Sequence, residues 1–158
     1  MGIIEELLII ETTEIDGEAY FVFQSTTTGN ENGFSIAPEN GITTKNVRDS
    51  LGYLIALDHD HPILFSNENT DDYLIYNNTW GDVYGVLLGT EENITVEAGT
   101  FLCKQNEIYA IHETGDIFPG RDEIYFSDGI GEIYRQYSAV STSQYRWEKR
   151  LIEYEIVD

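Results

Sequence analysis

The sequence predicts an all-β domain made of antiparallel strands. Tyrosine and phenylalanine are abundant, with 11 and 7 residues, whereas proline occurs only 3 times. Short apolar runs alternate with clusters of glycine, asparagine and aspartate, which is typical of strands joined by tight turns. Some runs are apolar on both faces. In EAYFVFQ, Tyr20 and Val22 point to one side of the strand and the phenylalanines between them point to the other.

A strand that is apolar on both faces belongs to a sheet that is covered on both faces. We therefore expect a single antiparallel, strongly curved sheet, folded as a half-barrel, a closed barrel or a sandwich. With 158 residues the chain is long enough for one domain, residues 1–158, that buries about two thirds of its unfolded surface. The single cysteine excludes a disulfide within the chain and carries no evidence about the redox compartment.

The elements of the first half follow from apolar runs and the turn residues between them. The opening run IIEELLII has isoleucines at both ends, which favour a strand over a helix. Pro62 sits where a strand would begin, after the polar turn around residues 58–61. The expected strands are residues 3–10, 18–24, 51–58, 61–66 and 72–77.

The segment KNVRDSLGYLI, residues 45–55, is the one place where a helix is an alternative. Val47, Leu51 and Leu54 recur at helical spacing, but Gly52 lies inside the segment and costs about 1 kcal/mol relative to alanine in a helix. We therefore expect at most one short helix in the chain.

The second half contains the clearest turn signals. Asp128-Gly129 is a hairpin signal between two aromatic strands. Ala98-Gly99 predicts a tight turn, since glycine takes positive φ without the usual steric cost. The expected strands are residues 82–89, 92–98, 100–111, 122–127, 131–139 and 146–157.

The charge balance limits the classes of partner. The chain has 29 acidic and 8 basic residues, for a formal net charge of −21. Nucleic acid is excluded as a partner, because binding it begins with cations that neutralise phosphates. Residues 49–103 hold ten acids and no lysine or arginine. We interpret the acidic excess as a device for solubility, with a face that binds cations or a partner as the alternative.

No apolar run reaches the 18 residues that a membrane-spanning helix needs, so we expect no transmembrane segment in this chain. The run IIEELLII is interrupted by Glu5 and Glu6 and lacks the basic region of a signal peptide. The protein is expected either to be cytoplasmic or to be exported with its signal absent from this chain.

Cys103, the only cysteine, shares one face of its expected strand with Phe101. A reactive thiol needs a nearby cation or imidazolium to lower its pKa, and the only local cation, Lys104, points to the opposite face. We therefore predict that Cys103 is a buried apolar side chain without a catalytic role.

Three motifs carry a resemblance to a known group of proteins. Val96 to Cys103 reads V-x-A-G-T-F-x-C, with Glu97 where proline is common. Residues 124–134 resemble an aromatic strand leading into G-V-G-x-V, and residues 151–154 stand in the place of a last strand. Thr13 to Tyr20 is similar to a D-G-x-x-Y motif near the start. Together these resemble Gram-negative envelope β proteins, many of them lipoproteins of unknown function.

This resemblance implies an elongated antiparallel sheet, such as the half-barrel of the lipoprotein carriers LolA and LolB. It also implies a location outside the cytoplasm, in the periplasm or anchored at the outer membrane. It supplies no catalytic residue.

Histidines supply the main candidate metal site. In the segment LDHDHP, His59 and His61 would share one face of an extended chain and could bind a transition metal, with His112 as a third ligand. We favour the interpretation of the same segment as a polar turn that leads into the strand opened by Pro62. Calcium is a further possibility, because loop aspartates lie beside asparagine and glycine, although the spacing of an EF-hand loop is missing. These aspartates are Asp71, Asp72, Asp116 and Asp128.

Enzyme motifs are absent from the sequence. There is no G-x-S-x-G elbow, and Tyr134 stands where a third glycine would complete a nucleotide-binding loop after Gly131. Trp80, Trp147 and the tyrosines could line a sugar-binding surface, but such aromatic residues usually pack across strands.

We therefore expect a non-catalytic cell-envelope domain, without a cofactor, that binds a hydrophobic small molecule or an envelope protein. Its ligand-lining residues are expected to be Tyr20, Val22, Phe101 and Tyr125. The alternatives are a metal-dependent hydrolase built on His59, His61 and His112, and a carbohydrate-binding module. The sequence does not specify the ligand, the partner or the oligomeric state.

Overall fold

The computed structural model describes residues 2–35, 37–57, 60–140 and 147–156. Every regular element in these residues is a β-strand, and all strand pairs are antiparallel. The predicted all-β antiparallel fold is therefore confirmed, but its strands form two sheets and not the single sheet that was expected, because no backbone pairing joins β5 (Ile63–Ser66) to β6 (Tyr73–Asn78). No helix that could cross a membrane occurs in the part of the chain that is described.

The strands form two hydrogen-bonded sheets, and in each sheet every strand pairs with its neighbours in the chain. Sheet A has the order β1-β2-β3-β4-β5 and sheet B the order β11-β10-β9-β8-β7-β6, so neither is closed into a barrel. Sheet A consists of β1 (Ile4–Ile15), β2 (Glu18–Thr28), β3 (Gly41–Ser50), β4 (Tyr53–Ala56) and β5 (Ile63–Ser66). Sheet B consists of β6 (Tyr73–Asn78), β7 (Gly81–Val96), β8 (Gly99–His112), β9 (Asp122–Ser127), β10 (Gly131–Tyr137) and β11 (Trp147–Arg150).

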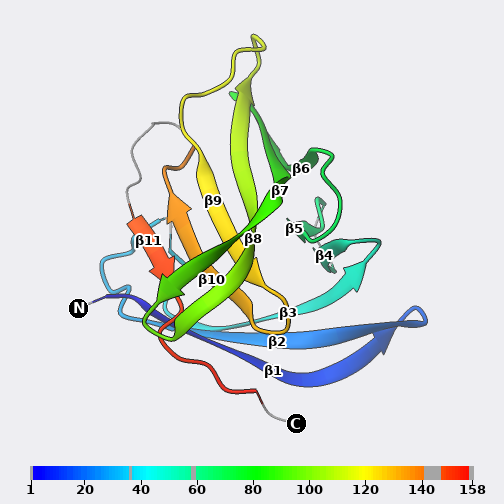
Figure 1. Cartoon of the computed structure of the whole chain (residues 1–158), viewed down its shortest axis with the longest axis vertical. Helices are drawn as coiled ribbons and strands as arrows, with labels where there is room; N and C mark the ends of the chain where they lie inside the picture. The colour runs from blue at the N-terminus through cyan, green and yellow to red at the C-terminus, as the bar shows by residue number, and fades with distance from the viewer. Residues whose placement is uncertain (1, 36, 58–59, 141–146, 157–158) are drawn as a thin grey trace.

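The strands of the two sheets cross, as Figure 1 shows: β1, β2 and β3 run across the view while β7 to β10 run along its length. The long β7–β8 hairpin spans the molecule, and the β1–β2 hairpin projects past sheet B. Crossed sheets of this kind share a core only where they overlap. The projecting hairpin therefore lies outside the shared core.

Turn residues set the hairpins, at the predicted turns near Gly99 and Gly129 and at one further turn, Asp16-Gly17. Asp16 and Gly17 join β1 to β2 with φ values of 53° and 81°, the left-handed pair that a two-residue hairpin turn requires. Gly99, with φ of 138°, follows the turn from β7 to β8, and Gly129, with φ of 76°, lies in the turn from β9 to β10. Aspartate and glycine tolerate these angles better than branched residues do.

The segment 45–55 is extended, so the helix alternative is not realised. It forms the second half of β3, a turn at Leu51 and Gly52, and β4. Val47 is buried on the strand with 1% of its surface exposed, whereas Leu51 is 91% exposed in the turn. The helical spacing of these two residues is therefore coincidental, since they face different surroundings.

Several other elements differ from their expected bounds; β1 and β2, for example, extend to Ile15 and Thr28. The strands expected at 82–89 and 92–98 form one strand, β7, with a bulge between Leu87 and Glu91. The last strand pairs with β10 only as far as Arg150. Leu151 then makes single backbone bonds to Ile133 and Ala98, and residues 152–156 leave the sheet.

Sheet B curls around an apolar cluster of its own. Its buried members come from four strands, and they pack against Phe101 and against Leu151 from the C-terminal segment. They are Val96, Cys103, Tyr125 and Ile133. A second cluster, Val83, Ala110 and Val140, is covered by Trp80 and Phe118 near the other end of the sheet. This strong curvature agrees with the prediction from the sequence.

The two sheets meet along β5 of sheet A. Phe65 on β5 packs on Phe126 of β9 with ring centroids 4.3 Å apart. Beside them lies Asn106 of β8, which is fully buried. β5 and β8 are not paired through their backbones, and the Asn106 side chain connects them by hydrogen bonds instead. Its Oδ1 accepts from the Ser66 backbone N–H (2.7 Å) and from the Tyr73 hydroxyl (2.7 Å), and its Nδ2 donates to the Ser66 carbonyl (2.8 Å). One amide thus joins β5, β6 and β8.

Candidate functional site

The two described histidines of the predicted metal site belong to different parts of the fold. His61 precedes β5, and His112 ends β8, where its Nδ1 lies 2.9 Å from Thr114 Oγ1. His59 and Asp58 lie outside the described residues. Within the described ranges, no three histidine, cysteine or carboxylate side chains gather in a way that could hold a metal ion. The metal-dependent hydrolase stays an alternative prediction without a described site.

The candidate calcium aspartates are engaged in separate contacts. Asp72 accepts from the Tyr109 hydroxyl at 2.9 Å, Asp116 accepts from Thr114 at 2.9 Å, and Asp128 pairs with Lys104 at 3.2 Å. Asp71 is exposed before β6. Asp72, Asp116 and Asp128 thus each bind a different side chain of the protein.

Cys103 is buried in the sheet B cluster, as predicted, with 1% of its surface exposed. Burial raises the pKa of its thiol to about 11, and the nearby Glu92 carboxylate adds to the effect. At neutral pH the group is therefore a thiol and not a thiolate, which is the nucleophilic form.

We expect Cys103 to resist thiol-reactive reagents in the native protein. A disulfide reagent at pH 8 should react completely with Cys103 in the protein unfolded in guanidinium. Over the same time it should leave Cys103 of the native protein unmodified, because the reagent can reach the thiol only when the strand opens. Absorbance of the released thiolate measures both reactions. Rapid modification of the native protein would contradict the burial described above.

The four residues predicted to line a ligand site do not face one cavity. Phe101 and Tyr125 belong to the sheet B cluster. Tyr20 and Val22 are buried on β2 of sheet A, where the Arg48 guanidinium lies 5.3 Å from the centre of the Tyr20 ring. These side chains are packed against protein and form parts of two separate apolar regions.

The tryptophans also pack within the fold. Trp80 meets Phe118 edge-on with ring centroids 5.3 Å apart, and Trp147 stacks on Tyr137 at 4.0 Å. Such cross-strand stacking is the usual role of aromatic residues in sheets.

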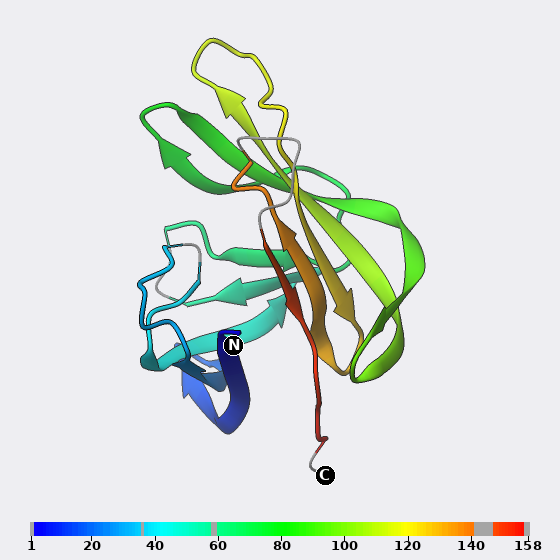
Figure 2. The same ribbon diagram turned by 90° about the vertical axis from the view of Figure 1, so that its left-hand side faces the viewer.

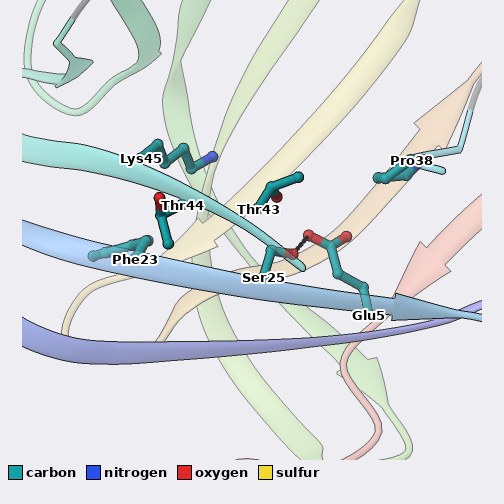
Figure 3. A pocket seen from close by; sticks show the side chains of 7 residues that line it. All are labelled: Glu5, Phe23, Ser25, Pro38, Thr43, Thr44 and Lys45. Carbon is teal, nitrogen blue, oxygen red and sulfur yellow. Dashed lines mark hydrogen bonds between the residues drawn. The ribbon is translucent and has the colours of Figure 1, made fainter. Parts of the chain in front are cut away.

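A pocket of about 300 Å³, lined by both polar and apolar side chains, opens on sheet A (Figure 3). It lies over β1, β2 and β3, and Lys45 and Thr43 project over it from β3. On its other side the Ser25 hydroxyl donates a hydrogen bond to the Glu5 carboxylate. Its lining residues are Glu5, Phe23, Ser25, Pro38, Thr43, Thr44 and Lys45.

An ion cluster next to this pocket connects the two sheets. Lys149 of β11 pairs with Glu5 of β1 at 2.8 Å and with Glu132 of β10 at 3.5 Å. Arg135 forms an ion pair with the second carboxylate oxygen of Glu132. We call Glu5, Glu132, Arg135 and Lys149 the inter-sheet ion cluster. Its side chains are mostly withdrawn from water, with Glu132 only 16% and Arg135 24% exposed.

The cluster keeps all of its members charged. Burial alone would raise the pKa of Glu132, but the charges of Arg135 and Lys149 outweigh it and hold the pKa below its ordinary value. Likewise, burial would lower the pKa of Lys149, and Glu132 and Glu5 raise it instead. Buried charges persist only when paired in this way. The cluster is therefore a structural link between sheets and not a poised acid or base.

The edge of sheet A is the least covered part of the protein. β1 has a strand neighbour on one side only, and its burial pattern is exposed along almost its whole length. The exposed apolar side chains and their exposed fractions are Ile4 54%, Leu7 50%, Leu8 46%, Ile9 60% and Ile10 47%. An edge strand of this kind offers a row of free backbone N–H and C=O groups beside apolar side chains.

Comparison with protein families, with curated proteins and with solved structures finds no match to this chain. The resemblance to Gram-negative envelope proteins therefore remains a prediction from the three motifs. The fold and the exposed surface are the remaining guides to function.

Sequence reasoning missed both features that stand out in the structure. The inter-sheet ion cluster joins residues from the two ends of the chain, and no local pattern marks a carboxylate as buried. The apolar character of residues 3–10 is visible in the sequence, which predicted a strand there without indicating that its side chains are exposed. The interruption by Glu5 and Glu6 is the one signal that pointed to an edge strand, because charged residues are common on edges.

Proposed function

We propose that this protein is a non-catalytic binding domain of the cell envelope that docks a partner polypeptide on the edge of β1. The observation that supports this proposal is the exposure of consecutive apolar residues on a strand that has a free edge. Strand addition to such an edge uses backbone hydrogen bonds for affinity and side chains for specificity. The envelope location rests on the resemblance alone, and fractionation of cells that make the natural protein would test it.

A partner protein is a better fit to this surface than a hydrophobic small molecule. The four predicted lining residues pack against protein, and the pocket on sheet A is bordered by Glu5, Lys45 and hydroxyl groups. A lipid-like ligand requires an enclosed apolar space. In contrast, the apolar side chains of β1 lie outside, where a second polypeptide can cover them.

Site-specific photo-crosslinking in the producing cells tests the proposal. A photoreactive amino acid at Leu8 of β1 should yield an adduct of one defined mass. The same amino acid at Ile117, which is 59% exposed in the loop at the far end of the molecule, is the matched control and should not yield it. Equal adducts from both positions, or none from Leu8, would contradict docking on β1.

A further inference from the structure

The surface beside β1 continues onto the C-terminal segment. The ion pair between Glu5 and Lys149 holds the first half of β1 next to β11, at 2.8 Å between the charged atoms. Beyond β11 the chain continues as an extended segment, residues 151–156, that runs past the same half of β1 (Figure 2). We call residues 4–10 and 151–156 the edge seam.

Both sides of the edge seam have backbone available for pairing. β1 pairs only with β2. Residues 152–156 belong to no strand, and in the described part of the chain they make no backbone hydrogen bond to another element. Tyr154 holds this segment in place through an edge contact with Phe101 of β8, with ring centroids 5.5 Å apart. An extended polypeptide laid along the seam could therefore pair with protein backbone.

The edge seam combines apolar and acidic side chains: β1 carries four consecutive apolar residues after Glu5 and Glu6, and the C-terminal segment alternates between the two kinds. On β1, Leu7 and Leu8 lie beside the exposed Glu6. On the C-terminal segment, Ile152 and Tyr154 are 56% and 49% exposed, and Glu153 and Glu155 alternate with them. The neighbouring cations are already engaged, since Lys149 pairs with Glu5 and Arg150 pairs with Glu148 at 2.9 Å. The open charges of the seam are thus negative.

We propose that the edge seam binds an extended polypeptide segment in which apolar residues alternate with lysine or arginine. This inference rests on the proposed function and specifies its partner. Alternation at period two places the apolar side chains of the bound segment on one face and its cations on the other. This matches the C-terminal side of the seam, where Ile152 and Tyr154 share one face and Glu153 and Glu155 share the other. Complementary charge of this kind sets specificity and the rate of association.

A second copy of this chain does not fit the same surface. Two copies would bring two acidic seams together, each on a chain with a formal net charge of −21. Like charges that face each other across an interface oppose association. The occupant is therefore a different, basic polypeptide.

The test uses fluorescent ten-residue peptides and the intact protein. The first peptide alternates isoleucine and lysine, the second alternates isoleucine and glutamate, and the third has the composition of the first with its lysines grouped at one end. We expect only the first to bind, by fluorescence anisotropy, and hydrogen exchange of residues 4–10 and 152–156 to slow in the complex. A fourth peptide, with N-methyl groups along one backbone edge of the first, should bind at least tenfold more weakly because it cannot pair.

Charge-reversal variants test whether peptide binding depends on the carboxylates of the edge seam or only on the net negative charge of the protein. Glu6→Lys with Glu153→Lys should weaken binding of the alternating lysine peptide at least tenfold. The matched control, Glu68→Lys with Glu113→Lys, changes the net charge equally at exposed positions outside the seam and should weaken it less than threefold. Equal losses in both variants, or equal binding of the peptide with grouped lysines, would overturn the inference.

Two further outcomes separate this inference from the proposed function. A specific adduct at Leu8 together with no binding of the alternating lysine peptide would refute the basic partner and keep docking on β1. A concentration-dependent dimer in analytical ultracentrifugation, lost when Leu8 is replaced by lysine, would assign the surface to a second copy and overturn the inference directly.

Discussion

Replacing Asn106 with alanine should lower the free energy of unfolding by at least about 3 kcal/mol. The substitution removes a side chain that satisfies three buried groups at once: the backbone N–H and C=O of Ser66 and the hydroxyl of Tyr73. Ser66 and Asn106 are fully buried and Tyr73 is 4% exposed, so water has little access to these groups. Each unsatisfied buried group costs about 1–3 kcal/mol.

Urea denaturation followed by tryptophan fluorescence measures this change. The matched control is Asn77→Ala on β6, whose amide donates to Asp82 at 2.8 Å in an exposed pair. The control should change the free energy of unfolding by less than about 0.5 kcal/mol. If Asn106→Ala were as mild as the control, the amide would not be what joins β5 to sheet B.

Replacing Glu132 with glutamine should destabilise the protein by about 3–5 kcal/mol, because it removes the central anion of the inter-sheet ion cluster. Arg135 and Lys149 would then lie close together with only Glu5 as a counter-charge. Glutamine keeps the shape of the side chain, so the loss reports charge and not packing. The exposed carboxylate Glu148, which pairs with Arg150 at the surface, is the matched control.

The same variant should change how stability depends on pH. The pKa of Glu132 and that of Glu5 are lowered in the folded protein: burial opposes this, and the neighbouring cations more than compensate. The stabilisation from a lowered carboxyl pKa is complete above its unfolded value, about 4.3, and is lost as the pH falls through the folded value. Urea midpoints between pH 3 and 6 should therefore fall less steeply with acid in Glu132→Gln than in the natural protein. Parallel pH curves, or no difference from Glu148→Gln, would show that Glu132 is not a buried ion-pair partner.

Local patterns in the sequence were sufficient for most of the fold. A hairpin turn such as Asp16-Gly17 or Asp128-Gly129 depends on the backbone conformation of only two adjacent residues. The position of such a turn can therefore be predicted from the local sequence alone. β3 was not predicted as a strand in its own right, because only Val47 among its residues is buried. A strand whose side chains are mostly in water lacks the apolar alternation on which such predictions depend.

The candidate site could be predicted much less well than the fold. Lys149 and Glu5 meet only because β1 and β11 are both edge strands on the same side of the molecule. Whether a strand lies at an edge depends on the order of all strands, which the residues of that strand do not encode. For this reason the sequence predicted a strand at residues 3–10 but not the exposure of its apolar side chains. The burial of Cys103 could be predicted, since it follows from the apolar residues of its own strand.

The sequential strand order has a consequence for how the chain folds. Every strand pair is formed by neighbours in the chain, so each pairing step closes a short loop at small entropic cost. All strands of sheet A precede residue 67, and all strands of sheet B follow residue 72. During synthesis the first sheet has its full set of pairing partners before the second leaves the ribosome. Cleavage between β5 and β6 would consequently leave every strand pair intact, and two separately produced halves would need only to dock.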